Sequence, residues 1–204
     1  MKIIFEKNSP YSFEYISKMI ANSMLENNLM VIVSCSSKKI WNSNPDVEKF
    51  CMAKDAYTGQ LFEKFRIFNM ICMSNKQFHY MNWKILSAKY GLIEPSQMIE
   101  NYNITFSKKY SEENKYVDYY DIGKEFTNKY IEHFTKYGID HKIKNVMVWG
   151  GGKYIEYIKK IILTNKGLFD MDLIAPFKGY RIGEALNAAN RFNDVMATEL
   201  IKYR

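Results

Sequence analysis

Five short apolar runs, separated by segments with helical periodicity, constrain the fold of this chain more than any other feature. The runs are KIIF (2–5), LMVIV (29–33), WKILS (83–87), KNVMVW (144–149) and MDLIAPF (171–177). A short, continuous apolar run is typical of a strand that is buried on both faces of a parallel sheet. Helices between such strands connect parallel neighbours. Residues 1–204 are therefore predicted to form a single α/β domain with a mostly parallel central sheet flanked by helices.

Apolar residues at helical spacing predict the elements between the strands. Helices are expected over residues 13–25, 59–74, 111–138, 153–165 and 183–203. Ser9 and Ser12 are alternative caps for the first of them. The core stripe of the last helix comprises Leu186, Ala189, Phe192, Met196 and Leu200. Residues 40–58, which contain NSNPD, and residues 89–107 are expected to be loops.

The charge of the chain bears on its partners. Its 204 residues include 29 Lys and Arg against 22 Asp and Glu, which gives a net charge of +7 and a pI near 9.1. Such a balance favours polyanions through an attraction that does not depend on sequence, so DNA or another nucleic acid is an expected partner. The alternative is compositional bias, because the chain is rich in Lys, Asn, Ile and Tyr and has only four Arg.

Several classes of site and location are disfavoured by what the sequence lacks. The three cysteines form no C-x-x-C pair and the three histidines lack metal-ligand spacing, so neither a disulfide framework nor a metal or other cofactor is expected. The N-terminal segment is broken by charges, and no apolar stretch approaches the roughly 18 residues of a membrane span. We therefore expect a cytoplasmic protein with no membrane partner, while the oligomeric state stays open.

Three of the predicted strands end in small or polar residues accompanied by lysine. These residues are Ser34, Cys35, Ser36, Lys38 and Lys39 after the second run, Ser87, Lys89, Tyr90 and Gly91 at the end of the third, and Gly150, Gly151 and Lys153 after the fourth. In an open α/β sheet the ligand crevice lies beyond the carboxyl ends of the strands. Small residues there leave room and expose backbone N–H groups, and lysines add positive charge. Phosphate or another anion is therefore the expected occupant.

Two common phosphate-binding motifs are absent from these segments. SCSSKK (34–39) does not match the G-x-x-x-x-G-K-[ST] loop of Walker-type NTPases, and GGGKY (150–154) lacks the spacing of the dinucleotide fingerprint. A glycine triplet after a strand also occurs as a plain strand-to-helix turn. The prediction of one pocket therefore depends on the three segments converging.

Four blocks of the sequence resemble a family of largely uncharacterised bacterial and phage proteins. The blocks are VIVSCSSKK (31–39), AKDAYTGQLFEKFR (53–66), ILSAKYGLIEPSQMIENYNITF (85–106) and FKGYRIGEALNAANRF (177–192). The third is also similar to a segment of the peroxide-stress YaaA-type proteins, and the first is similar to a lysine-containing motif in the middle domain of archaeosine synthases. Members of the wider group are linked to DNA binding, modified-base chemistry and base excision in phage defence. The resemblance therefore implies a nucleobase- or DNA-directed role.

One position departs from the family pattern. Relatives often have Asp in the block that matches Ile99–Phe106, where this chain has Asn103. An amide cannot act as a general base, so either the reaction is weakened or another residue supplies the carboxylate. Asp55 is the first choice for that carboxylate, followed by Glu94 and Glu100.

The residue types in these segments suit cleavage of the bond between a base and its sugar. Such an enzyme holds the base against aromatic rings, orients or activates water with a carboxylate, and contacts the flanking phosphates with cations. The candidates are Tyr57, Tyr90 and Tyr102 for stacking, Lys38, Lys39, Lys89 and Lys153 for phosphate, and Gln97, Asn101 and Asn103 for the base edge. Asp55 and Lys38 are the candidate catalytic residues. Alternatively, Lys38 or Lys39 is a Schiff-base nucleophile.

The leading hypothesis is a nucleic-acid-directed enzyme of N-glycosidic chemistry, such as a DNA glycosylase that acts on modified bases in phage defence or DNA modification. A non-catalytic DNA-binding stress-response protein is the first alternative, and an enzyme of free nucleotides or nucleosides is the second. For some of these candidate site residues a purely structural role is the alternative to a functional one. Asp55 and Tyr57 could cap and pack against the following helix, and Cys35 could be a small buried residue.

Overall fold

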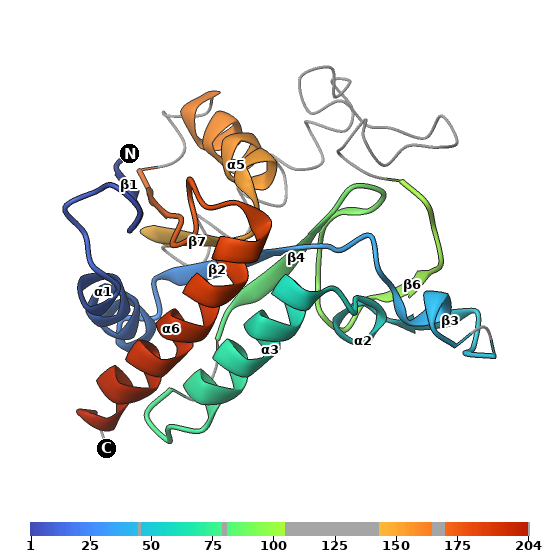
Figure 1. The fold of residues 1–204 in the computed structure, drawn as a ribbon, viewed down its shortest axis with the longest axis horizontal. Coiled ribbons are helices and arrows are strands. Elements are labelled where there is room, and N and C mark those ends of the chain that lie inside the picture. Colours follow the sequence, from blue (N-terminus) through green and yellow to red (C-terminus); the bar gives the residue numbers. More distant parts are fainter. Residues whose placement is uncertain (45, 79–80, 105–142, 165–169, 204) are drawn as a thin grey trace.

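A six-stranded sheet lies at the centre of the protein, with its strands in the order β1-β8-β7-β2-β4-β5. Figure 1 labels β1, β7, β2 and β4 of this sheet. The structure is a computed structural model that describes residues 1–44, 46–78, 81–104, 143–164 and 170–203. The strands of this sheet are β1 (Ile3–Ile4), β2 (Leu29–Ser34), β4 (Trp83–Ser87), β5 (Gly91–Ile93), β7 (Asn145–Trp149) and β8 (Asp172–Ile174). All neighbours pair in parallel except β5, which runs antiparallel to β4 at one edge. The predicted α/β fold with a mostly parallel sheet is confirmed.

Strand β2 is covered on both faces, which explains its continuous apolar sequence. It pairs with β7 on one side and with β4 on the other. Val31 and Val33 belong to one hydrophobic core, whereas Met30 and Ile32 belong to a second core on the opposite face. Successive side chains of a strand point to opposite faces, so a strand between two cores needs apolar residues at every position.

Helices form a layer on each side of the sheet (Figure 1). One face is covered by α1 (Phe13–Leu25), α3 (Gln60–Met73) and α6 (Ile182–Ile201), and the other by α5 (Gly152–Thr164). The first layer buries a cluster of aromatic rings around Trp149, whose indole Nε1 donates to the carbonyl oxygen of Leu61 at 3.0 Å. Among the described residues no helix has the length and apolar character needed to cross a membrane.

Two short strands form a separate antiparallel ribbon beside the main sheet. They are β3 (Phe50–Met52) and β6 (Met98–Glu100), with the 3-10 turn η1 (Ile40–Asn42) and the short helix α2 (Ala53–Ala56) next to them. The expectation of loops over residues 40–58 and 89–107 is wrong at η1 and α2 and at the strands β3, β5 and β6. Each of these elements has only three or four residues, which is too short to show a period in the sequence, and the pairing of β3 with β6 joins segments far apart along the chain.

The other expected elements lie close to their predicted positions. Ser12 rather than Ser9 caps α1, since its Oγ accepts a hydrogen bond from the backbone N–H of Tyr15 at 3.3 Å. Leu25, the last residue of α1, is exposed. The helix expected over residues 111–138 lies outside the described residues.

Candidate functional site

The carboxyl ends of β2 and β7 form the point where the chain leaves the sheet in two directions. After β2 the chain passes through α3 on one face before it enters β4, and after β7 it passes through α5 on the opposite face before β8. Adjacent strands whose connections diverge in this way leave a crevice in open α/β sheets, and ligands bind there. The segment from Ser34 to Lys39 and the glycines after β7 therefore occupy the position that the fold offers for a ligand.

Small residues let the two segments approach each other closely at this point. A Cβ atom built on Gly150 would lie 2.9 Å from the Cβ of Ser34, so residue 150 has no room for a side chain. One turn further on, the hydroxyl of Tyr154 lies 3.4 Å from the sulfur of Cys35. Gly151 and Gly152 are exposed at the start of α5, and no atom of the described residues lies within 4 Å of a Cβ added to either. The triplet therefore combines one packing glycine with two open ones.

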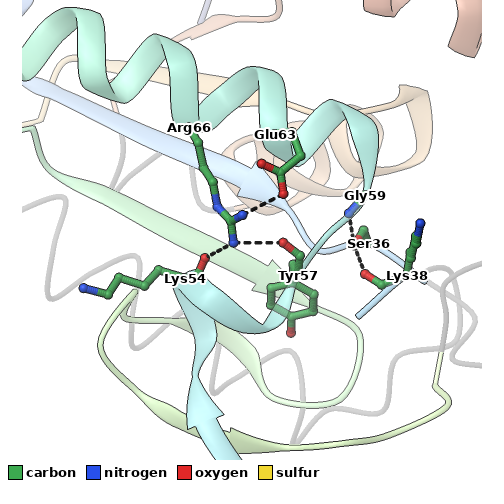
Figure 2. A network of polar contacts seen from close by, with 7 residues as sticks. All are labelled: Ser36, Lys38, Lys54, Tyr57, Gly59, Glu63 and Arg66. Carbon is green, nitrogen blue, oxygen red and sulfur yellow. Dashed lines mark hydrogen bonds and ion pairs between the residues drawn. The ribbon is translucent and has the colours of Figure 1, made fainter. Parts of the chain in front are cut away.

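The segment after β2 is fixed against the start of α3. The hydroxyl of Ser36 accepts a hydrogen bond from the backbone N–H of Gly59 at 3.1 Å and donates to the carbonyl oxygen of Lys38 (Figure 2). A Cβ on Gly59 would lie 2.5 Å from that of Ser36, so only glycine fits. The backbone N–H of Thr58 donates to the carbonyl oxygen of Lys38 at 3.0 Å. Lys39 and Tyr57 then form an isolated antiparallel bridge.

Arg66 of α3 holds the segment that leads into this bridge. Its guanidinium donates to the carbonyl oxygens of Lys54 at 2.6 Å and of Tyr57 at 3.1 Å, and it forms an ion pair with Glu63 at 2.6 Å (Figure 2). The ring of Tyr57 points away from Arg66 in Figure 2. Arg66 thus acts on the backbone and leaves the tyrosine hydroxyl directed elsewhere.

Three hydroxyl groups meet beneath the carboxyl ends of β2 and β4, and we call Tyr57, Ser87 and Tyr102 the hydroxyl cluster. The hydroxyls of Tyr57 and Tyr102 lie 2.7 Å apart, and that of Ser87 lies 2.8 Å from that of Tyr102. All three residues are buried. Burial raises the pKa of both tyrosines well above the ordinary value, and the nearby Cys35 thiol adds to that effect, so both are neutral hydroxyl groups.

Lys39 lies directly against this cluster. Its Nζ is 4.3 Å from the centre of the Tyr102 ring, and the residue is only 4% exposed. Within the described residues its Nζ donates one hydrogen bond, to the carbonyl oxygen of Ser37 at 3.3 Å. Burial lowers the pKa of the Lys39 ammonium, while the charge of Cys35 acts in the opposite direction. The amine therefore loses its proton more readily than an exposed lysine does.

Lys89 and Tyr90 form the rim above the cluster, in the three-residue turn between β4 and β5. Ser87 pairs with Gly91, whose φ of 82° suits glycine in such a turn. Lys89 Nζ forms an ion pair with Glu100 at 2.8 Å, which raises the pKa of Lys89 and lowers that of Glu100. The ring of Tyr90 stands edge-on to that of Tyr102, with the ring centres 5.4 Å apart.

The structure thus brings together some of the predicted site residues and leaves others outside. Cys35, Lys39, Tyr57, Ser87, Lys89, Tyr90 and Tyr102 are linked by contacts or by electrostatic interaction, and Ser34, Ser36, Gly91 and Gly150 position them. Lys38, Asp55, Asn101, Asn103 and Gly151 are exposed. Among the described residues no hydrogen bond or ion pair joins the Asp55 carboxylate to the cluster. Its charge instead raises the pKa of the Cys51 thiol, after the effect of burial.

Two of the predicted stacking residues have their rings inside the protein. Tyr57 is fully buried and Tyr102 is 9% exposed, whereas Tyr90 is half-buried. The alternative interpretation of these tyrosines as core-edge residues therefore describes Tyr57, because its ring has no face open to a base. Tyr90 is the one ring of the three with substantial exposure.

Sequence reasoning gave no role to Tyr154, Arg66 or a second polar cluster at the carboxyl ends of β1 and β8. In that cluster Tyr180 donates a hydrogen bond to Glu6, and Arg191 lies 3.5 Å from the Tyr180 hydroxyl. Burial, with help from Glu6, raises the pKa of Tyr180 to about 12. Tyr180 and Arg191 lie within the block 177–192, so that block was the signal available for them.

Within the described residues no three His, Cys, Asp or Glu side chains are grouped so that they could hold a metal ion. The three cysteines are free thiols. The site as described therefore offers hydroxyl groups, a buried amine, a thiol and rim cations as its chemical groups.

Comparison with known proteins gives a match across most of the chain. The profile of the "Family of unknown function (DUF6884)" matches residues 30–191, which include the segments around Lys39, Tyr57, Ser87 and Gly150. The chain is also 26% identical over 164 residues to "Uncharacterized protein YfjM" of Bacillus subtilis (strain 168), covering 79% of this chain and 93% of that protein. The expected resemblance to an uncharacterised family is confirmed, whereas the likeness to YaaA-type proteins and archaeosine synthases stays a prediction.

Proposed function

The chain belongs to the family of unknown function DUF6884, and on that premise we propose that it is a nucleic-acid-directed enzyme that cleaves the bond between a nucleobase and its sugar. A DNA glycosylase acting on modified bases, in phage defence or DNA modification, is the specific form of the proposal. The observation that carries it is the meeting of Lys39, Lys89 and the hydroxyl cluster at the carboxyl ends of β2 and β4. Cations, hydroxyls and an aromatic rim in this position suit a nucleotide better than a neutral metabolite.

The rim residues have distinct roles in this proposal. Lys38 is exposed and Lys89 is half-buried, so both can meet the phosphates beside the target nucleotide. Tyr90 offers the ring on which a displaced base stacks, because Tyr57 and Tyr102 are buried. The side chains of Asn101 and Asn103 are exposed nearby in sequence and are the candidates for the base edge.

Asp55 keeps the role of water-activating carboxylate. Of the carboxylates considered, Glu94 pairs with Lys84 and Glu100 pairs with Lys89. Asp55 is exposed and forms no ion pair within the described residues. In the proposed reaction a water oxygen attacks C1′ of the sugar, its proton passes to Asp55, and the base leaves with the electron pair of the broken bond.

Purified protein incubated with modified phage DNA tests the proposal. Abasic sites, counted with an aldehyde-reactive probe, are expected in modified DNA and not in an unmodified duplex of the same sequence. Asp55→Asn is expected to lower the rate by at least about 100-fold. Intact modified DNA across a panel of modifications would contradict the proposal.

The same preparation distinguishes the two alternatives. Duplex binding that weakens steeply with salt, without abasic sites and without sensitivity to Asp55→Asn, indicates a non-catalytic DNA-binding protein. Release of bases from free nucleosides or nucleotides, without affinity for DNA, indicates an enzyme of free nucleotides.

A further inference from the structure

Lys39 differs from the paired lysines of the structure in the partner of its amine. Lys7, Lys84, Lys89, Lys159 and Lys202 each have a glutamate oxygen within 3.2 Å of Nζ. Lys39 is 4% exposed, which is close to the 3% of Lys84, yet no carboxylate of the described residues pairs with it. A buried ammonium without a counter-charge is costly, and lysine relieves that cost by releasing its proton.

The groups around the Lys39 amine are neutral or weakly polar. Among the described residues they are the carbonyl oxygen of Ser37, the ring of Tyr102 and the thiol of Cys35, whose ionised form would favour the ammonium. The residue that accepts this hydrogen bond, Ser37, is exposed. The interaction with the ring stabilises the cationic form, but less than a carboxylate would. These surroundings favour the neutral amine, which is the nucleophilic form, more than solvent does at an exposed lysine.

We propose that the Nζ of Lys39 attacks C1′ of an abasic deoxyribose and forms a covalent imine with it. This activity rests on the proposed function, because excision of a base leaves a sugar whose open-chain form is an aldehyde at C1′. The lone pair of the neutral amine forms the new C–N bond, and the carbonyl oxygen leaves as water together with the two hydrogens of the amine. The enzyme thereby holds its own reactive product at the site of its formation.

Hydride trapping tests the imine directly. The full-length protein is mixed with a synthetic duplex that contains one preformed abasic site, and borohydride reduces the imine to a stable amine. A protein–DNA adduct is expected, and digestion followed by mass spectrometry is expected to place the modification on residue 39. No adduct, or modification confined to another lysine or to the N-terminal amine, overturns the proposal.

Two substitutions of Lys39 distinguish the role of its nucleophilic amine from the role of its positive charge. Lys39→Arg keeps a cation but has no nucleophilic amine, and Lys39→Met keeps an unbranched side chain without either. Both are expected to lower the adduct yield by at least tenfold. Lys18→Arg is the matched change at an exposed lysine of α1, outside the proposed site, and adduct at residue 39 is still expected from it. Adduct that persists in Lys39→Arg but disappears in Lys18→Arg contradicts the assignment.

The preformed abasic site keeps this test independent of base excision. Abasic sites in modified DNA without a trapped adduct would remove the role of Lys39 and leave the proposed function standing. An adduct with preformed abasic DNA, together with no excision from any modified DNA, would remove the glycosylase and leave a protein that captures abasic sites.

Discussion

Lys39 and Lys84 are buried to the same degree beside the central strand, and they differ in what their amines contact. Lys84, within β4, is 3% exposed and lies 2.5 Å from a carboxylate oxygen of Glu94. Lys39, beyond the end of β2, is 4% exposed and lies over the ring of Tyr102. The first arrangement neutralises a buried cation, whereas the second leaves it without a counter-charge. The comparison teaches that the partner of a buried lysine, rather than its burial, separates a structural role from a chemical one.

The largest effect on stability is expected at the paired lysine. Glu94→Gln removes the counter-charge of Lys84 and leaves its ammonium buried. Because the Glu94 side chain is 39% exposed, we expect a loss of about 2 kcal/mol in the free energy of unfolding, below the roughly 3–5 kcal/mol of a fully buried pair. Urea unfolding followed by circular dichroism measures it. Glu100→Gln, whose partner Lys89 is more exposed, is the matched control with a smaller loss.

Lys39→Met is expected to raise the free energy of unfolding, whereas Glu94→Gln lowers it. The substitution replaces a buried amine, which has no carboxylate partner among the described residues, with an apolar side chain of similar shape, so the free energy of unfolding should rise by about 1 kcal/mol. The same variant should lose the borohydride adduct, as residues kept for chemistry often reduce stability. A variant that is less stable than the wild type would show that Lys39 has a structural role like that of Lys84.

The pH dependence of stability sharpens the comparison further. Burial lowers the pKa of Lys39 in the folded protein, so between that pKa and the ordinary value of 10.5 the unfolded chain binds more protons and stability rises with pH. The advantage of Lys39→Met should therefore be greatest at low pH and shrink toward pH 10.5. Lys89, whose pKa is raised chiefly by its hydrogen bond to Glu100, stabilises the fold below pH 10.5 and loses that effect above it. Urea unfolding between pH 6 and about pH 12, with Lys89→Met as the contrasting variant, measures both trends.

The smallest effect is expected at Lys38. Its side chain is exposed, so Lys38→Met should change the free energy of unfolding by no more than about 0.5 kcal/mol. Replacement by Met would then change the stability of the protein at Lys39 but not at the adjacent Lys38. A large loss for Lys38→Met would show that the two lysines exchange places in solution.

The elements that the sequence predicted well are those whose residues all face one environment. Strands β2, β4 and β7 are covered on both faces, so their sequences are mostly apolar, with Lys84 of β4 paired to Glu94, and their ends lie within a residue of the predicted ones. Strands β3 and β6 were missed because each has only three residues, with Phe50, Met52 and Met98 exposed. Their pairing depends on a partner 46 to 50 residues away, as in the pair of Met52 with Met98 and that of Phe50 with Glu100, and no local pattern reports it.

The sequence predicted where the site residues lie in the fold, but not which of their side chains point inward. The sequence placed small residues, lysines and tyrosines at the carboxyl ends of the strands, and the structure has them there. It could not tell Lys38 from Lys39, because successive residues of an irregular segment have no period that says which one points inward. The bridge between Lys39 and Tyr57 makes that choice, with the hydrogen bond of Ser36 to Gly59 holding the turn. Tyr57, predicted as a stacking surface, is buried for the same reason.

The sequence by itself determined the layered α/β architecture and the edge of the sheet that carries the polar residues, because apolar periodicity and strand ends are local properties of the chain. Only the tertiary structure decided which side chains at that edge are buried and what each of them contacts. Burial and pairing of a charge depend on segments distant in sequence, here 36–39, 57–59, 87–90 and 100–102, and their free energies are set by those neighbours rather than by residue type.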